Sequence, residues 1–464
     1  MPWLSLRHHG SSSADTADRS IIRNRRLLLA TVGAALVIAG VMVTRSRVAT
    51  GKWRWRSDPK TGIKWAPVPS TWPDAIYTDP VWSPDGKSIY FWQQRLGVSS
   101  SPYEIVRLDL ASGDRHLVAE GSDFDISPDG RWLVYQPNDD YLTVKDLESG
   151  AKAKIRQRGV VWPTWWGAGR LIYWADYARE LRLVHVPGFR QETLLRSRFR
   201  PLWSMAPNGT RLAACLARGR LAEVLVIDLQ THRTLRIAEA ECKDPPEWSP
   251  DSRWVAFTAV SRPAEAGAAA KVLTRIYLYD VKTASLRLLT GQPDESDPCW
   301  SPVGKRLAYV RRLRPPTSAL QPQPRYEVCV RDLDRKKTTV LASSDGLGGM
   351  PSHKEWGLWW KIKWSPDGRW LCYRPVNRVA NERSRGAVGL VRSDGAVSAV
   401  VSDPPLIPAD WAPDSTRLVC VFPSSKANAS SYSPYWVVDV ASASATGRGT
   451  RRVAGGHESN ASRR

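Results

Sequence analysis

The sequence predicts an all-β fold, namely a β-propeller of four-stranded blades with a transmembrane helix before it. Two observations lead to this prediction. A short turn phrase recurs along most of the 464 residues, and an apolar run of 18 residues without a charge lies near the N-terminus. A chain of this length would ordinarily divide into two or three domains, but a repeat array can extend one architecture over all of it.

The N-terminal region predicts a membrane segment. Residues 1–26 are polar and basic and are expected to be disordered. Residues 27–44 form the apolar run, which as a helix would be about 27 Å long, close to the hydrocarbon thickness of a bilayer. No small-residue cleavage site precedes Arg45, which favours an uncleaved anchor over a removed signal segment. We expect single-pass membrane localisation with the propeller extracytoplasmic, in the periplasm or at the cell surface.

Residues 45–78 are rich in Trp and Pro and are too short for a domain, so they are interpreted as a linker, with packing onto the array as the alternative. The propeller is then expected over residues 79–455. Residues 456–464 are predicted to be a disordered tail.

The turn phrase is best seen in Trp82-Ser83-Pro84-Asp85-Gly86. Pro sets φ at the second turn position and Gly relieves the last, which is typical of a tight turn between strands. Two β-rich runs, a second turn ending in Ser-Gly or similar, and a last short run follow most copies. The phrase or a decayed form of it is centred on Trp82, Ile126, Trp165, Met205, Trp248, Trp300, Trp364 and Trp411.

Five of the seven spacings between these anchors are 39 to 47 residues, close to the 40–45 residues of a four-stranded propeller blade, and the other two are 52 and 64 residues. Eight copies predict eight blades. Seven is the alternative, if the decayed copy at Trp165 or at Met205 is not a full blade.

The phrase resembles the WD40-like (TolB-type, PD40) β-propeller repeat, whose core reads W-S-P-D-G-x-x-I-A-F. The resemblance covers roughly four-fifths of the chain and implies the fold, with little about function. TolB itself has a separate α/β domain before its propeller. Only residues 51–78 separate the apolar run from the first copy here, so this chain is not expected to be TolB itself.

Strand parity predicts which face of the propeller carries a binding site. In an antiparallel blade, the turn between strands one and two shares a face with the turn between strands three and four. The longest insertions fall on the opposite face, in 259–271, 311–325, 343–361, 374–386 and 423–434. Long loops on a rigid scaffold often bind ligands. The candidate binding residues in them are Arg311, Arg312, Arg314, Arg325, Trp356, Trp359, Trp360, Arg378, Arg383 and Arg385.

Two simpler interpretations stay open. The insertions can be flexible segments without a ligand, with Trp359 and Trp360 packed on a neighbouring blade. The formal net charge of +22 suggests an anionic partner, but it also fits arginine-rich solvated faces.

No catalytic or metal motif is found in the sequence. It lacks a G-x-S-x-G elbow, a P-loop and a dinucleotide fingerprint. The seven His are scattered, and the Asp of the phrase is explained as a turn former. The six Cys show no C-x-x-C spacing, and no disulfide is assigned. We therefore expect no catalytic residue, no metal and no cofactor.

The function predicted from these features is a membrane-anchored, non-catalytic scaffold that binds an unknown protein or an anionic ligand. The alternative is an extracytoplasmic propeller that binds or cleaves an acidic polysaccharide. Nucleic acid is not expected as a partner, because no compact run interleaves basic and aromatic residues.

Overall fold

The structure is a computed structural model that describes residues 53–443, except 69–74, 78–79, 96–102, 139, 157–158, 160, 176, 178, 198–201, 219–220, 243, 262–272, 314–324, 345–346, 349, 352–358, 361, 376–386, 405 and 423–434. This part of the chain is all β. It holds no helix of the length and hydropathy that a membrane span requires. The predicted segments 1–26, 27–44 and 456–464 lie outside the described residues.

The strands of the first half form antiparallel sheets of chain neighbours. One sheet contains β3 (Ala75–Tyr77), β4 (Val81–Trp82), β5 (Ser88–Arg95), β6 (Glu104–Asp109) and β7 (Arg115–Glu120). The next contains β8 (Ser122–Ile126), β9 (Trp132–Asn138), β10 (Tyr141–Asp146) and β11 (Lys152–Arg156). A third contains β12 (Val161–Trp165), β13 (Arg170–Ala175), β14 (Glu180–His185) and β15 (Arg190–Arg196).

The next sheet along the chain is larger, because its two halves are joined through β19 and β21. Its first half contains β16 (Leu202–Met205), β17 (Arg211–Arg218), β18 (Leu221–Asp228) and β19 (Thr234–Cys242). Its second half contains β20 (Glu247–Trp248), β21 (Trp254–Ser261), β22 (Leu273–Asp280) and β23 (Ser285–Leu288).

The remaining strands follow the same order. One sheet contains β24 (Glu295–Trp300), β25 (Arg306–Leu313), β26 (Arg325–Asp332) and β27 (Lys337–Ser344). The next contains β28 (Leu347–Gly348), β31 (Ile362–Trp364), β32 (Trp370–Pro375), β33 (Val388–Arg392) and β34 (Ser398–Val401), beside a hairpin of β29 (Met350–Pro351) and β30 (Trp359–Trp360). The last contains β35 (Ile407–Trp411), β36 (Arg417–Val421) and β37 (Tyr435–Asp439), together with two strands from the other end of the chain.

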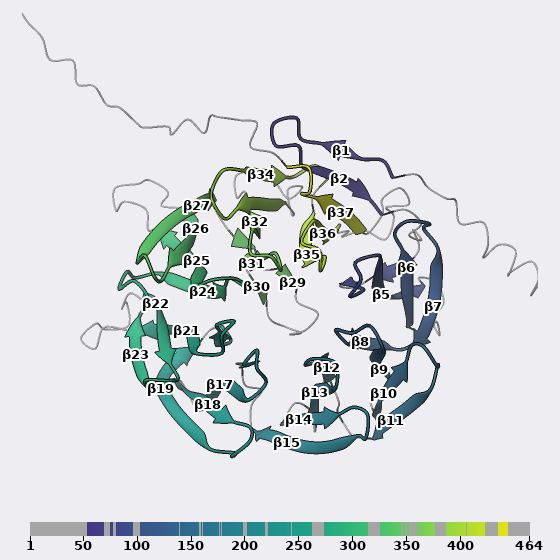
Figure 1. Cartoon of the computed structure of the whole chain (residues 1–464), viewed down its shortest axis with the longest axis horizontal. Helices are drawn as coiled ribbons and strands as arrows, with labels where there is room; N and C mark the ends of the chain where they lie inside the picture. The colour runs from purple at the N-terminus through teal and green to yellow at the C-terminus, as the bar shows by residue number, and fades with distance from the viewer. Residues whose placement is uncertain are drawn as a thin grey trace, which may run out of the picture. The chain divides into compact units, whose positions relative to one another are not determined.

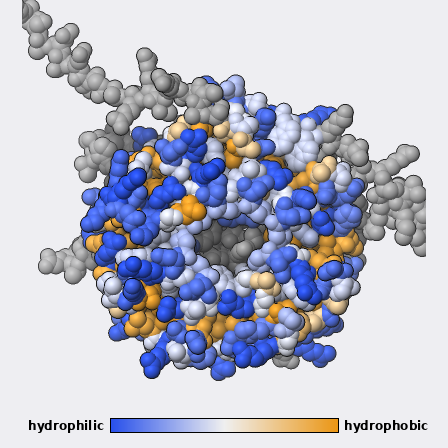
Figure 2. All heavy atoms as spheres, in the orientation of Figure 1, coloured by the Kyte–Doolittle hydropathy of each residue, from blue (hydrophilic) through white to orange (hydrophobic). Residues whose placement is uncertain are grey.

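The sheets follow one another around a central opening, so the fold is a β-propeller, as predicted (Figure 1). Apolar clusters lie between neighbouring sheets. One of them joins Leu142 and Ile155 of one sheet to Leu171 and Tyr173 of the next. Figure 2 shows one face, which is hollowed at its centre and mostly hydrophilic.

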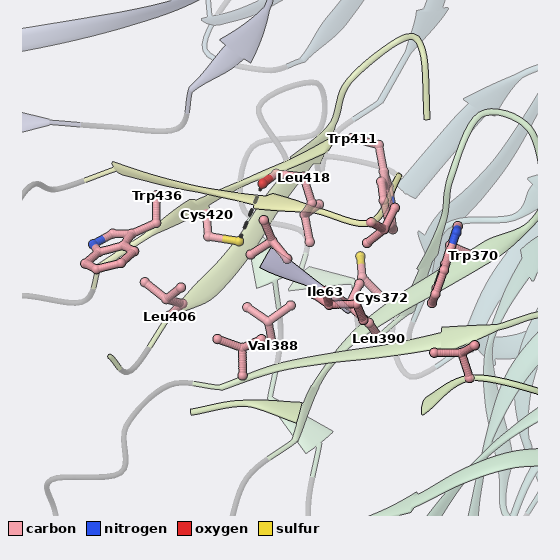
Figure 3. Packing of buried hydrophobic residues seen from close by; sticks show 14 residues of the cluster. Ile63, Trp370, Cys372, Val388, Leu390, Leu406, Trp411, Leu418, Cys420 and Trp436 are labelled. Atoms are coloured by element: carbon pink, nitrogen blue, oxygen red, sulfur yellow. Dashed lines mark hydrogen bonds between the residues drawn. The ribbon is translucent and has the colours of Figure 1, made fainter. Parts of the chain in front are cut away.

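The N-terminal part of the described chain closes the ring, which corresponds to the alternative stated for residues 45–78, packing onto the array. β2 (Lys64–Pro67) pairs antiparallel with β37, and β1 (Arg56–Ser57) pairs with β2. The pairing is driven by burial, because Ile63 and Ala66 have no exposed surface. Figure 3 shows Ile63 inside the cluster that includes Leu418 and Val388. Residues 64–67 therefore belong to the propeller.

In five of the eight copies, the Trp that opens the turn phrase links its strands to those of the copy before it. Its indole Nε1 donates a hydrogen bond to a backbone carbonyl of the previous copy. The acceptor is the residue immediately before the first residue of the turn phrase in that copy. Trp82 reaches the last sheet in this way, with 3.1 Å to the Asp410 carbonyl, which closes the ring. The same bond joins Trp165 to Asp125, Trp248 to Ser204, Trp300 to Glu247, and Trp364 to Cys299.

The turn phrase is held by its own side chains. The Ser83 hydroxyl donates to Asp85 Oδ1 at 2.5 Å and accepts the N–H of Ser88 at 2.9 Å. Asp85 Oδ1 also accepts the N–H of Lys87. Equivalent bonds form at Ser127, Ser249 and Ser365, so the phrase specifies the first turn of a blade through local contacts.

The two short turns of each blade lie on one face, as strand parity predicts. The N–H of Leu110, in the turn after β6, donates to the carbonyl of Lys87, in the turn before β5. Equivalent bonds run from Leu147 to Arg131, Leu229 to Thr210, Val281 to Arg253, Leu333 to Lys305, Ser393 to Arg369, and Val440 to Thr416. This face is called the turn face below.

Two copies carry Ser where the phrase has Gly. Ser252 and Ser415 adopt left-handed φ of 58° and 62°, a conformation that costs energy for residues other than Gly. Each hydroxyl accepts a hydrogen bond from the turn of the preceding copy, at 3.0 Å from Asn208 N and 2.9 Å from Asp367 N. These bonds between successive copies offset the strain within each turn.

The Asp that ends the third strand of a blade predicts an acid-sensitive fold. The carboxylate of Asp280 is buried, and the bidentate bond from Arg253 holds its pKa below the ordinary value of 3.8. A lowered pKa means that the ionised group adds stability above its unfolded pKa, and that this stability is lost as pH falls through the folded value.

We therefore expect Asp280→Asn to lower Tm at pH 7, with a deficit that shrinks as the pH is lowered from about 5 to 3. Thermal melts of both proteins at each pH measure the deficit. Asp334→Asn is the control, because that carboxylate is 67% exposed and pairs with Lys305 at the surface. A deficit that stays constant over this range would contradict the account.

Candidate functional site

Half of the residues predicted for the binding site lie outside the described residues. They are Arg314, Trp356, Arg378, Arg383 and Arg385. The backbone of Trp359 and Trp360 forms β30, which pairs with β29 within the predicted 343–361 connection.

Arg311 lies in β25, whereas the sequence placed it in a loop. Its guanidinium is 3.2 Å from Glu295 Oε1 and 3.6 Å from Glu327 Oε2, and it also donates to the Tyr309 hydroxyl at 2.9 Å. The three charged residues are register partners across β24, β25 and β26. Glu295 is buried, so the charge of Arg311 balances carboxylates within the sheet.

Arg312 and Arg325 are the exposed cations of the predicted site in the described residues. They lie at the same end of neighbouring strands, because Arg312 pairs with Tyr326 and Leu313 pairs with Arg325. The strands extend further into the predicted insertion 311–325 than expected, since β25 ends at Leu313 and β26 begins at Arg325.

A cleft of about 520 Å³ lies on the turn face where the first and last sheets meet. We call it the closure cleft. Trp53 and Trp55 line one side, and residues from the turns of the two sheets line the other. These turn residues include Lys87, Asp109, Asp414, Arg417 and Asp439. A second cleft of about 510 Å³ lies beside it and shares Asp414 and Thr416.

The two Trp of the closure cleft form a fixed stacked pair. Trp53 Nε1 donates to the Leu110 carbonyl at 3.0 Å, which ties it to the first sheet. The rings of Trp53 and Trp55 are 5.2 Å apart and nearly parallel, at 15°. Trp55 is 41% exposed, so it offers an aromatic surface that is already held in place.

Arg417 joins the sheets at the base of the cleft. Its Nη2 donates to the Gly86 carbonyl at 2.7 Å and to Asp414 Oδ2 at 3.2 Å. Its guanidinium also lies 5.0 Å from the ring of Trp82. Through these contacts, the guanidinium of Arg417 helps to hold the last sheet against the first.

Two carboxylates of the closure cleft, Asp109 and Asp414, have lowered pKa values. Hydrogen bonds from the Ser112 and Ala111 N–H groups lower the pKa of Asp109. Burial acts to raise the pKa of Asp414, but bonds from Thr416 and the charge of Arg417 outweigh it and lower the pKa. Asp109 and Asp439 accept their turn bonds through Oδ1, so Oδ2 of each has no hydrogen-bond partner among the described residues. The cleft thus combines an aromatic surface with available acceptor atoms.

The part of the chain that the structure describes holds no group of three or more His, Cys, Asp or Glu placed to bind a metal ion. All six Cys are free. Burial raises the pKa of the Cys329 and Cys372 thiols to about 12, so these two are protonated at neutral pH.

No protein-family model matches the chain, and no curated protein matches it. Solved structures that are similar include an oligogalacturonate lyase from Vibrio parahaemolyticus, with 13% identity over 84% of this chain and 96% of that chain, and a TM-score of 0.48. TolB from Acinetobacter baumannii is 16% identical over 68% and 79%, with a TM-score of 0.36. The Cps50 (Swd1) β-propeller domain of Myceliophteria thermophila is 10% identical over 79% and 98%, with a TM-score of 0.41.

These neighbours include a TolB protein and another β-propeller. Each likeness extends to the fold alone.

Sequence reasoning did not find the closure cleft. Trp53 and Trp55 stood out in the Trp-rich segment, but nothing local places them beside Asp414 and Arg417 at the far end of the chain. No local signal could have found them, because the only described partner of β2 in its own region is β1, and its other partner, β37, comes from the far end of the chain.

Proposed function

We propose that this chain is a membrane-tethered β-propeller of eight blades that acts as a non-catalytic binding scaffold. Each of the eight anchor positions lies in the inner strand of an antiparallel set or at its end. The sets at the decayed copies support eight over seven, because β12–β15 and β16–β19 both have four strands.

The tether and the extracytoplasmic location of the propeller rest on the sequence. Residues 27–44 carry no charge over a length that suits a bilayer, and a short basic segment precedes them. The partner we expect is a protein or an anionic ligand, and not a nucleic acid.

The binding role is supported by one observation, namely that the closure cleft combines fixed carboxylates with a stacked Trp pair. Asp109 and Asp414 have lowered pKa values and are fixed by turn bonds. A general acid or base at neutral pH needs a pKa close to the working pH, so these carboxylates suit ligand contacts better than proton transfer. The rigid Trp pair beside them supplies contact area without an ordering cost.

A second candidate function is glycan binding, which the stacked Trp pair favours. Aromatic faces next to carboxylate acceptors suit a sugar ring, which has an apolar face and a hydroxyl rim. The acidic polysaccharide predicted from the sequence fits this cleft less well, because Asp109, Asp414 and Asp439 outnumber Lys87 and Arg417. A neutral saccharide is the better match.

The test is calorimetric titration of the full chain with neutral oligosaccharides, namely cello-, malto- and chito-oligomers, and with oligogalacturonate. Products are followed in the same samples by mass spectrometry. Trp55→Ala is expected to weaken neutral saccharide binding by about tenfold. Tyr177→Ala is the matched control, because Tyr177 is 74% exposed and lies away from the cleft.

Turnover of any of these glycans would overturn the scaffold proposal. Tight oligogalacturonate binding that Trp55→Ala leaves unchanged would exclude the closure cleft as the sugar site. If neither class binds, the glycan candidate is rejected and the protein-binding scaffold is retained.

A further inference from the structure

β11 is the outer strand of its sheet, and no described strand pairs with its far edge. It pairs with β10 alone among the described strands, in the order β11-β10-β9-β8. In an edge strand, alternate backbone N–H and C=O groups point away from the sheet and can pair with another chain. The edge of β11 is therefore a template for a further strand.

The exposed face of β11 carries an unbalanced row of cations. Lys152, Lys154 and Arg156 are exposed and occur at every second residue, so their side chains share one face. Ile155, on the other face, is buried toward the next sheet. No carboxylate among the described residues forms an ion pair with any of the three cations.

On three other outer strands, a cation has a side-chain partner. Arg196 of β15 pairs with Glu180 at 3.1 Å, and Arg236 of β19 pairs with Glu223 at 3.7 Å. Arg115 of β7 donates to the side-chain carbonyl of Gln93. One Lys on an edge is enough to deter aggregation, whereas three in register repel one another. Protection of the edge alone does not explain the row on β11.

Two contacts keep this row in place. Lys145 is the register partner of Lys152, and its Nζ donates to the Val118 carbonyl of the neighbouring sheet at 2.8 Å. Lys154 Nζ lies 4.4 Å from the centroid of the Tyr141 ring. Burial lowers the pKa of Lys145, and the charge of Lys152 lowers it further, as expected where positive charge is not balanced.

We propose that β11 binds an extended peptide that carries Asp or Glu at alternate positions and adds to the sheet as its next strand. Side chains on one face of a strand are about 6.7 Å apart, so such a peptide places one carboxylate opposite each of Lys152, Lys154 and Arg156. Its backbone groups satisfy the open edge. The proposal is independent of the closure cleft and of the question of catalysis.

A peptide fits these features better than another polyanion. A nucleic acid can meet the three charges, but it does not offer N–H and C=O groups at strand spacing. Pairing with the backbone edge of β11 therefore distinguishes a peptide from a nucleic acid. A single-stranded oligonucleotide serves as the competing probe.

The experiment uses the full chain and a fluorescein-labelled peptide of four Val-Glu repeats, with binding measured by anisotropy at low salt. The triple variant K152E/K154E/R156E is expected to weaken binding by about tenfold or more. The control variant K336E/K337E removes two exposed cations from another blade and is expected to bind as the wild type does.

Backbone pairing is tested with two further peptides, N-methylated on the Val residues or on the Glu residues. Strand addition predicts that one of the two loses binding and that the other keeps it, because only alternate N–H groups face β11. Equal binding of the two N-methylated peptides would show that only charge attracts the peptide to β11, and it would overturn the proposal. Binding of oligo-dT as tight as the peptide, or unchanged binding by the triple variant, would overturn it as well.

Discussion

A chain that begins at residue 68 is expected to lose cooperative folding, whereas a chain that begins at Gly51 keeps it. The deletion removes β2 and exposes the edge of β37 and the cluster that Ile63 fills. Ile63 alone contributes about 1.5–3 kcal/mol of burial, and the lost strand pairing and Trp53 contacts bring the cost to about 5 kcal/mol or more. That is comparable to the whole stability of many domains.

Circular dichroism melts and size-exclusion chromatography compare the two chains. The chain from residue 68 is expected to lack a sharp transition and to form larger species through its open edge. A peptide of residues 51–68 added in trans is expected to restore part of the transition. Melting within a few degrees of the chain from Gly51 would show that the closing strand is dispensable.

Arg311→Met is expected to destabilise the protein by about 3 kcal/mol. The substitution keeps the length of the side chain but leaves the buried Glu295 and its neighbour Glu327 without their shared cation. Breaking a buried pair from one side is costly, because the remaining charge stays in a poorly solvated site. The free energy of unfolding from urea denaturation measures the loss.

Two variants frame this result. Arg312→Met changes the exposed neighbour and is expected to alter stability by less than about 0.5 kcal/mol. The double variant R311M/E295Q is expected to recover part of the loss, because the amide carries no charge to desolvate. If R311M is as stable as R312M, the ladder of Glu295, Arg311 and Glu327 does not hold the sheet.

The propeller could be predicted from the sequence because its signal is local. Ser83 and Asp85 bond to the backbone within five residues, so each copy of the phrase encodes its own turn wherever it occurs. The placement of the short turns on one face followed from strand parity alone. The copy at Trp165 lacks Ser, Pro and Asp, yet its strands form a full sheet that packs on its neighbour. The copy at Met205 keeps Pro207 and Gly209, and Asn208 Oδ1 accepts the N–H of Thr210 as Asp does in other copies.

The parts that sequence reasoning missed depend on distant partners. β2 has no turn phrase and contains Pro67, and its pairing with β37 cannot be read from either segment. Arg311 looked like a surface cation, because Glu295 and Glu327 come from neighbouring strands at spacings that no motif records. The closure cleft was missed for the same reason, because Trp55 and Asp414 line one cleft only when the ring is complete.

The joining of the two chain ends in one sheet sets the order of events during biosynthesis. Gly62 accepts a hydrogen bond from the hydroxyl of Ser442, a residue made 380 positions later. At about 5–20 residues per second, the ribosome needs roughly 20 to 80 s to deliver that partner. Hairpins form within microseconds, so earlier blades can assemble while β2 waits unpaired. The nascent chain therefore carries β2 without its partner strand for most of its synthesis, and the ring can close only after β37 has been made.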